Sequence, residues 1–180
     1  MPAPSESRQH DGAIGLHIVS MTDIEIQGID SSALARVLDR GIDSGGNPIE
    51  PFTDSDGSWP LRCCLVDSQS GDRIAIIAWS PLPWRGAYAE TGPIVVHVGH
   101  CSGPSVKGRL PPELDAQPMT LRPYGPDHRI AYNKVRHVPG GASLTAHVGE
   151  LLEDQGIEIV HGRNVTGGCF SFQASRAQRR

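Results

Sequence analysis

The sequence predicts an α+β fold, with an antiparallel or mixed β-sheet and two helices in a single compact domain. Apolar runs typical of strands follow one another in groups and do not alternate singly with helices, which argues against a parallel α/β sheet. Two segments have the i, i+3, i+4 apolar spacing of an amphipathic helix. With 21 glycines and 15 prolines among 180 residues, the chain is too rich in turn formers for a helical bundle.

The length fits one domain with one substantial core. Residues 1–14 are predicted to be a disordered tail, residues 15–174 the domain and residues 175–180 a basic tail. No apolar run approaches the roughly 20 residues of a membrane span, and the first residues lack the features of a secretory signal. A net charge of −4 argues against general nucleic-acid binding. We therefore expect a cytoplasmic protein.

The first half of the chain begins with an alternating apolar pattern over 16–29, which predicts a strand. A helix follows, with Ser31 or Ser32 as the N-cap and Gly41 at its end. Its apolar stripe consists of Leu34, Val37 and Leu38. Turn formers throughout 43–58 predict a long loop.

Two β-rich runs, 60–67 and 73–82, flank a glycine-containing turn and predict a β-hairpin. The continuous apolar run 93–101 predicts a central strand that is covered on both faces. Residues 81–92 and 102–118 are rich in glycine and proline and are expected to be loops.

In the second half, 119–124 and 128–135 predict two strands around a Gly-Pro-Asp turn. The second helix is expected to begin after Ser143 and to end at Gly156. Two further strands, 157–165 and 168–174, are joined through Thr166, Gly167 and Gly168.

The chain has four cysteines, which a cytoplasmic setting would keep reduced. No C-x-x-C pair is present, so neither a zinc ribbon nor a thioredoxin-type site is predicted. Neighbouring side chains on a strand point to opposite faces, so we expect only one of Cys63 and Cys64 to line a given site. No metal site is predicted, and the cofactor is left open.

One group of residues that carries chemistry is Glu90 with His97, because a carboxylate and an imidazole can form an acid–base pair. The alternative is that Glu90 pairs with an arginine and His97 is a polar group of the core. His97 and His100 would lie on opposite faces of a strand, so a metal bound by both histidines would need a bulge between them.

A second group lies where one strand ends and the next begins. His161 offers a general base, Arg163 an anion clamp, Asn164 an orienting amide and Cys169 a thiol. The alternative is a structured turn shaped by Asn164, with Cys169 as a small buried hydrophobe.

Fourteen of the 16 basic residues are arginines, whose guanidinium groups match carboxylate and phosphate geometry. If several members of one set of arginines converge, they form an anion site, whereas each alone is a surface salt-bridge partner. The set consists of Arg62, Arg122, Arg129 and Arg163. No P-loop, dinucleotide fingerprint, H-E-x-x-H helix or G-x-S-x-G elbow is present.

Four runs together resemble DUF1203, a bacterial family of unknown function, over about residues 58–174. They are P-L-R-C-C-L-V-D, Y-A-E-T-G-P-I-V-V-H, M-T-L-R-P-Y and V-H-G-R-N-V-T-G-G-C-F. The resemblance implies that seven residues match the pattern of the family. They are Arg62, Cys64, Tyr88, His161, Asn164, Gly168 and Cys169. Relatives often carry a second histidine where this chain has Arg163, which weakens a two-histidine metal site. The family implies one domain and no particular activity.

These observations lead to two hypotheses. The first is a small bacterial enzyme that acts on a polar or anionic metabolite by His/Glu acid–base chemistry, with Cys64 or Cys169 as a nucleophile. The expected ligand-binding residues are Arg62, Tyr88, Arg122, Arg163 and Asn164. The second is a non-catalytic ligand-binding or homo-oligomeric assembly module, with a homodimer as its simplest form. Neither hypothesis includes a nucleic-acid or membrane partner.

Overall fold

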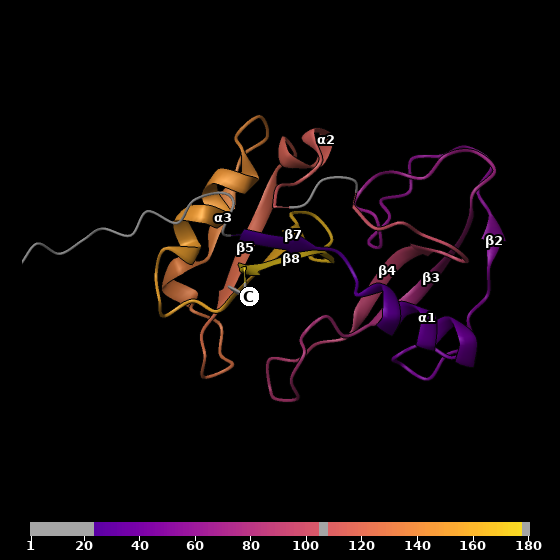
Figure 1. Ribbon diagram of the computed structural model, residues 1–180, viewed down its shortest axis with the longest axis horizontal. Coiled ribbons are helices and arrows are strands. Elements are labelled where there is room, and N and C mark those ends of the chain that lie inside the picture. The colour runs from indigo at the N-terminus through magenta and orange to yellow at the C-terminus, as the bar shows by residue number, and fades with distance from the viewer. Residues whose placement is uncertain (1–23, 105–107, 178–180) are drawn as a thin grey trace, which may run out of the picture.

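The strands form two separate antiparallel sheets in the computed structural model, which describes residues 24–104 and 108–177 (Figure 1). The larger sheet has the order β1-β8-β7-β5-β6 and the smaller one the order β2-β3-β4. The larger sheet consists of β1 (Ile24–Gln27), β8 (Phe170–Arg176), β7 (Ile159–Asn164), β5 (Met119–Tyr124) and β6 (Arg136–Val138). The smaller sheet consists of β2 (Phe52–Thr53), β3 (Arg73–Trp79) and β4 (Gly92–His97).

The two predicted helices are both present. Helix α1 (Ser31–Arg40) is capped by Asp30, whose carboxylate accepts the Ala33 N–H at 2.7 Å, and not by a serine. It ends at Gly41, whose left-handed conformation (φ 68°) suits a glycine. Helix α3 (Leu144–Leu152) begins after Ser143 as predicted but ends before Gly156. A short helix α2 (Pro112–Asp115) lies in a predicted loop.

Each sheet has its own apolar core, and the loop 61–65 contributes to both. The core of the larger sheet includes Leu121, Val148 and Phe172, and α3 packs against this sheet (Figure 1). The core of the smaller sheet includes Ile74 and Val96. Leu61 belongs to the smaller core and Leu65 to the larger. The predicted α+β class, antiparallel pairing and single compact domain are confirmed.

Residues 60–67 are not the hairpin strand that the sequence predicts. They form a loop closed by a bridge between Pro60 and Asp67, and Leu65 has a left-handed backbone (φ 64°). Leu61 forms a parallel bridge with Val95 along the free edge of β4. The antiparallel partners of β3 are instead β2 and β4. Because β4 has a single strand neighbour, it is an edge strand, although its middle residues are buried.

Other boundaries also differ. The predicted strand 128–135 includes a 3-10 helix, Tyr132–Lys134, and β6 takes the place beside β5. Strand β8 continues to Arg176, past the predicted boundary at 174. The predicted tail 1–14 and the first half of the predicted strand 16–29 lie outside the described residues. Within the described ranges, no helix is long and apolar enough to cross a membrane.

The pairing of β7 with β8 shifts register between Gly162 and Arg163. Such a bulge changes the direction of the following side chain. Gly162 itself lies against the buried ring of Phe172. A Cβ atom at Gly162 would come within 2.1 Å of that ring, so the glycine is required for this packing.

We therefore expect Gly162→Ala to destabilise the protein by about 1–3 kcal/mol through overpacking of the core. Chemical denaturation measures the change. Gly86→Ala is the matched control, because a Cβ at Gly86 meets no atom within 4 Å. Equal stability of the two variants would contradict the packing argument.

Candidate functional site

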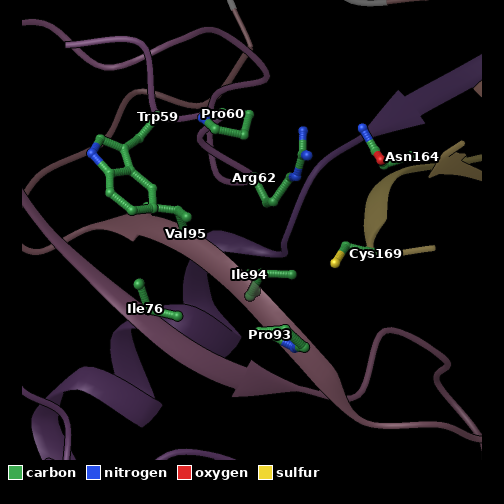
Figure 2. A pocket seen from close by; sticks show the side chains of 9 residues that line it. All are labelled: Trp59, Pro60, Arg62, Ile76, Pro93, Ile94, Val95, Asn164 and Cys169. Carbon is green, nitrogen blue, oxygen red and sulfur yellow. The ribbon is translucent and has the colours of Figure 1, made fainter. Parts of the chain in front are cut away.

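Two neighbouring cavities lie between the smaller sheet and the turn that joins β7 to β8. One has a volume of about 300 Å³ and is walled by Trp59, Ile76 and Val95, with Arg62 and Asn164 at its polar side (Figure 2). The other has a volume of about 200 Å³. Pro93 and Cys169 line both cavities, and we call the two together the groove.

Arg62 is the buried cation of the groove. Its backbone is held on both sides, because its N–H donates to Val95 O at 2.8 Å and its carbonyl accepts from Ile29 N at 2.8 Å. The residue is only 8% exposed. Within the described part of the chain, its guanidinium forms neither an ion pair nor a side-chain hydrogen bond. Figure 2 shows the end of this side chain on the side of Asn164.

Burial lowers the pKa of Arg62, and the charges of Cys169 and Asp67 partly oppose this effect. A guanidinium stays protonated at any physiological pH despite such a shift. The groove therefore contains a mostly buried positive charge that forms no direct ion pair with a described residue and is opposed at longer range by Asp67. This arrangement favours an anionic ligand.

Asn164 combines the two roles that the sequence left as alternatives. Its side-chain Oδ1 accepts the N–H groups of Thr166 at 2.9 Å and Gly167 at 2.8 Å, so it shapes the turn. These two donors fix which end of the amide is the oxygen. The NH₂ group is consequently the end that is available to a ligand, and it faces the same space as the Arg62 guanidinium (Figure 2).

Glu90 lies in the second cavity and forms ion pairs with two arginines. Its Oε1 accepts from Arg122 Nη1 at 2.5 Å and forms an ion pair with Arg163. Arg163 is buried, and its Nη1 also donates to Gly168 O at 3.2 Å. Desolvation lowers the pKa of Arg163. One carboxylate facing two guanidinium groups leaves a net positive charge at this end of the groove.

The arginines that the sequence analysis considered as one anion site lie in two separate places. Arg122 and Arg163 meet at Glu90, as the ion-pair alternative anticipates, while Arg62 lies apart in the first cavity. Tyr88 lines neither cavity. It packs in a small cluster with Leu82, and its ring lies 6.4 Å from that of Tyr132.

His161 lies inside the larger sheet and does not line the groove. It is fully buried, with its ring edge-on to Tyr124 and Phe170, and its Nε2 lies 3.2 Å from Gln173 Oε1. Desolvation lowers the pKa of His161 from 6.5 to about 3. A histidine with this pKa is neutral near pH 7 and is poorly suited to exchanging protons with a ligand.

His97 and Glu90 do not form the acid–base pair considered from the sequence. Glu90 precedes the first residue of β4 and His97 is its last residue, and the strand itself spans about 16 Å at about 3.3 Å per residue. The Nδ1 atom of His97 lies 3.6 Å from Cys63 Sγ and 3.8 Å from Cys64 Sγ. Its Nε2 atom lies 3.3 Å from Asp72 Oδ2.

Cys63, Cys64, His97 and Cys101 form a compact group, which we call the thiol cluster. Their ligand atoms all lie within 4.8 Å of one another, so the prediction that only one of the adjacent cysteines lines a given site is wrong. The physical reason is that Cys63 and Cys64 lie in a turn and not on a strand. A hydrogen bond from Cys63 lowers the pKa of Cys64 to about 6, and the same bond raises that of Cys63.

Sequence reasoning missed three contributors to these sites. Trp59 and Ile76 form the apolar wall of the groove, and they are 39% and 49% exposed. Asp72 contacts His97 from the turn before β3. The sequence around Trp59 and Ile76 does not indicate that the two side chains are exposed on the same surface. Their place in the groove could therefore not be predicted from neighbouring residues.

The fold and the groove define an α+β protein with a cationic groove between two antiparallel sheets. Residues 58–176 match the model of a family described as protein of unknown function, DUF1203. This range covers well over half of the chain, so the protein belongs to that family, as the resemblance predicted. Searches of curated proteins and of solved structures found no match.

The buried His161 leads to a prediction about pH. Above pH 6.5, its ordinary pKa, the histidine is neutral in both the folded and the unfolded chain. At lower pH, only the unfolded chain takes up the proton, so the free energy of unfolding falls by up to about 1.4 kcal/mol per pH unit. This loss continues until the folded pKa near 3 is reached.

We expect His161→Gln to reduce this slope between pH 5 and 6, measured by denaturation at several pH values. The other histidines contribute to both proteins and cancel in the comparison. The aspartates with lowered pKa values titrate in the unfolded chain near 3.8, below this window. An unchanged slope would show that His161 is protonated inside the fold.

Proposed function

We propose that this protein binds a small organic anion in the groove, with the Arg62 guanidinium as the anchor. The observation that carries the proposal is the burial of this charge without a direct ion pair among the described residues. An unpaired buried charge costs several kcal/mol. A carboxylate or phosphate of a ligand would remove this cost and would also accept from the NH₂ group of Asn164.

The walls of the groove indicate the rest of the ligand. Opposite the polar side, Trp59, Ile76 and Val95 present apolar surface, which suits an aromatic or aliphatic body. The larger cavity, about 300 Å³, is at the lower end of the range for small-molecule pockets. The proposed ligand class is therefore an amphiphilic carboxylate or phosphate of metabolite size.

The geometry favours binding over the His/Glu acid–base chemistry considered from the sequence. His161 is enclosed in the larger sheet, and Glu90 is held by two guanidinium groups. Neither side chain is available as a base for a ligand at Arg62. The exposed apolar side chains Trp59 and Ile76 belong to the groove, so we assign them to ligand binding and not to a homodimer interface.

A second candidate function is covalent chemistry at Cys169. This thiol lines both cavities and lies close enough to Arg62 for their charges to interact. A ligand anchored at Arg62 would place its neighbouring atoms beside the sulfur. The bacterial, cytoplasmic setting that we propose for this protein would keep this thiol reduced.

The binding proposal predicts opposite effects of Arg62→Gln on affinity and on stability. Losing a hydrogen-bonded charge contact worth about 1.5–3 kcal/mol weakens anion binding by about 10- to 100-fold. Removing an unpaired buried charge should at the same time raise the melting temperature of the ligand-free protein. Benzoate and phenyl phosphate are the first probes, with inorganic phosphate as the head group alone, in calorimetric titrations and thermal shift assays.

Arg36→Gln is the matched control for this experiment, because Arg36 is an exposed arginine on α1, outside the groove. It should leave both affinity and melting temperature unchanged. A ligand-free Arg62→Gln protein that melts below the wild type would contradict the proposal, since Arg62 would then be stabilising the fold by itself.

The second candidate predicts that iodoacetamide alkylates Cys169 and that a saturating groove ligand slows this reaction. Peptide mass spectrometry identifies the modified thiol, and Cys169→Ser is the control that removes the signal. Alkylation at the same rate with and without phenyl phosphate bound would separate Cys169 from the ligand site and exclude the covalent function there.

A further inference from the structure

We propose that the thiol cluster is a zinc site, in which Cys63, Cys64, His97 and Cys101 bind one Zn²⁺ in tetrahedral geometry. This site is separate from the groove and takes a different ligand, so it does not depend on the proposed function. Three thiolates and one imidazole are a ligand set typical of structural zinc. All four ligand atoms come from described residues, and they lie within 4.8 Å of one another.

The distances fit the edges of a zinc tetrahedron. With a Zn–S bond of about 2.3 Å and a Zn–N bond of about 2.05 Å, a tetrahedral centre places sulfur and nitrogen about 3.6 Å apart. His97 Nδ1 lies 3.6 Å from Cys63 Sγ and 3.8 Å from Cys64 Sγ. A small contraction of the cluster around an ion would bring all the edges into this range.

The surroundings of the cluster also match those of a metal site. His97 directs Nδ1 at the thiols, and its Nε2 lies 3.3 Å from Asp72 Oδ2. This is the carboxylate–histidine arrangement that orients a metal-binding imidazole. Asp72 is itself fixed, because its Oδ2 accepts the Gln69 N–H at 2.8 Å.

A backbone amide also points at one of the sulfur atoms, because the His97 N–H donates to Cys63 Sγ at 3.4 Å. A donor in this position would stabilise the negative charge of a metal-bound thiolate.

The ligand set distinguishes zinc from other metals and assigns it a structural role. Thiolate and imidazole ligands in a tetrahedron favour Zn²⁺ over Mg²⁺, Ca²⁺ or Mn²⁺, which prefer oxygen. Four protein ligands leave no open coordination position for a substrate. The ion would join three parts of the chain, namely the 61–67 loop, the end of β4 and the segment that follows it.

The test uses the full chain, stripped of metal by a chelator and kept under a phosphine reductant. Titration with Co²⁺ should produce a thiolate-to-cobalt charge-transfer band and the visible bands of a tetrahedral ion, saturating at one equivalent. Zn²⁺ should displace the cobalt and raise the melting temperature. No charge-transfer band in the wild type would overturn the proposal.

Four variants separate a metal site from a packed group of thiols. Cys101→Ser and His97→Ala should each remove or strongly weaken Co²⁺ binding, whereas Cys169→Ser, which changes the one cysteine outside the cluster, should bind like the wild type. Asp72→Asn leaves all four ligands in place and should lower affinity by about 10- to 100-fold. Because Asp72 is partly exposed, this variant remains informative if a ligand variant does not fold.

Undiminished Co²⁺ binding in both Cys101→Ser and His97→Ala would overturn the assignment. These outcomes are independent of the groove. Loss of anion binding in Arg62→Gln with normal Co²⁺ binding would support both proposals, and the failure of either experiment leaves the other unaffected.

Discussion

The structure depends on the backbone of Arg62, which lies between two segments that belong to different sheets. Its N–H donates to Val95 on β4, and its carbonyl accepts from Ile29, which follows β1. Gly28 is required at this point, because a Cβ there would meet the Arg62 carbonyl oxygen at 2.0 Å. These contacts connect the smaller sheet to the larger one and fix the position from which the guanidinium enters the groove. The same constraint therefore determines both the joining of the sheets and the placement of the charge.

Charge balance explains why buried polar groups in this protein differ in function. Arg163 is as buried as Arg62, but it forms an ion pair with Glu90 and donates from Nη1 to the Gly168 carbonyl, although its Nε has no hydrogen-bond partner among the described residues. His161 avoids the cost of burial by remaining neutral, as its lowered pKa indicates. Arg62 is compensated in neither of these two ways. A guanidinium does not lose its proton at physiological pH, and no described carboxylate forms an ion pair with Arg62. An external anion is the remaining way to compensate this charge.

Local patterns in the sequence were sufficient for the regular elements. The apolar stripe of α1, the cap of α3 and the runs of β3, β5, β7 and β8 all depend on neighbouring residues, and they were predicted correctly. The loop 60–67 was not, because its β-rich composition is overridden by the free edge of β4 and by the left-handed Leu65. This error placed Cys63 and Cys64 on opposite faces of a strand, and the thiol cluster was therefore not predicted.

Individual groove residues such as Arg62, Asn164 and Cys169 were identifiable by type, whereas Trp59 and Ile76 join them only through contacts between distant segments.

The thiol cluster and the groove meet in the same short loop, because Cys63 directly follows Arg62. The loop is already held by its own backbone, because Arg62 donates to Val95 O and Leu65 donates to Leu61 O. A zinc ion held by Cys63, Cys64, His97 and Cys101 would add a second attachment of this loop to the end of β4. The backbone contacts fix the anchor for the anion, and the metal would make no contact with the ligand. Placing the two sites next to each other along the chain allows a domain with two small cores to hold an unpaired guanidinium in a fixed position.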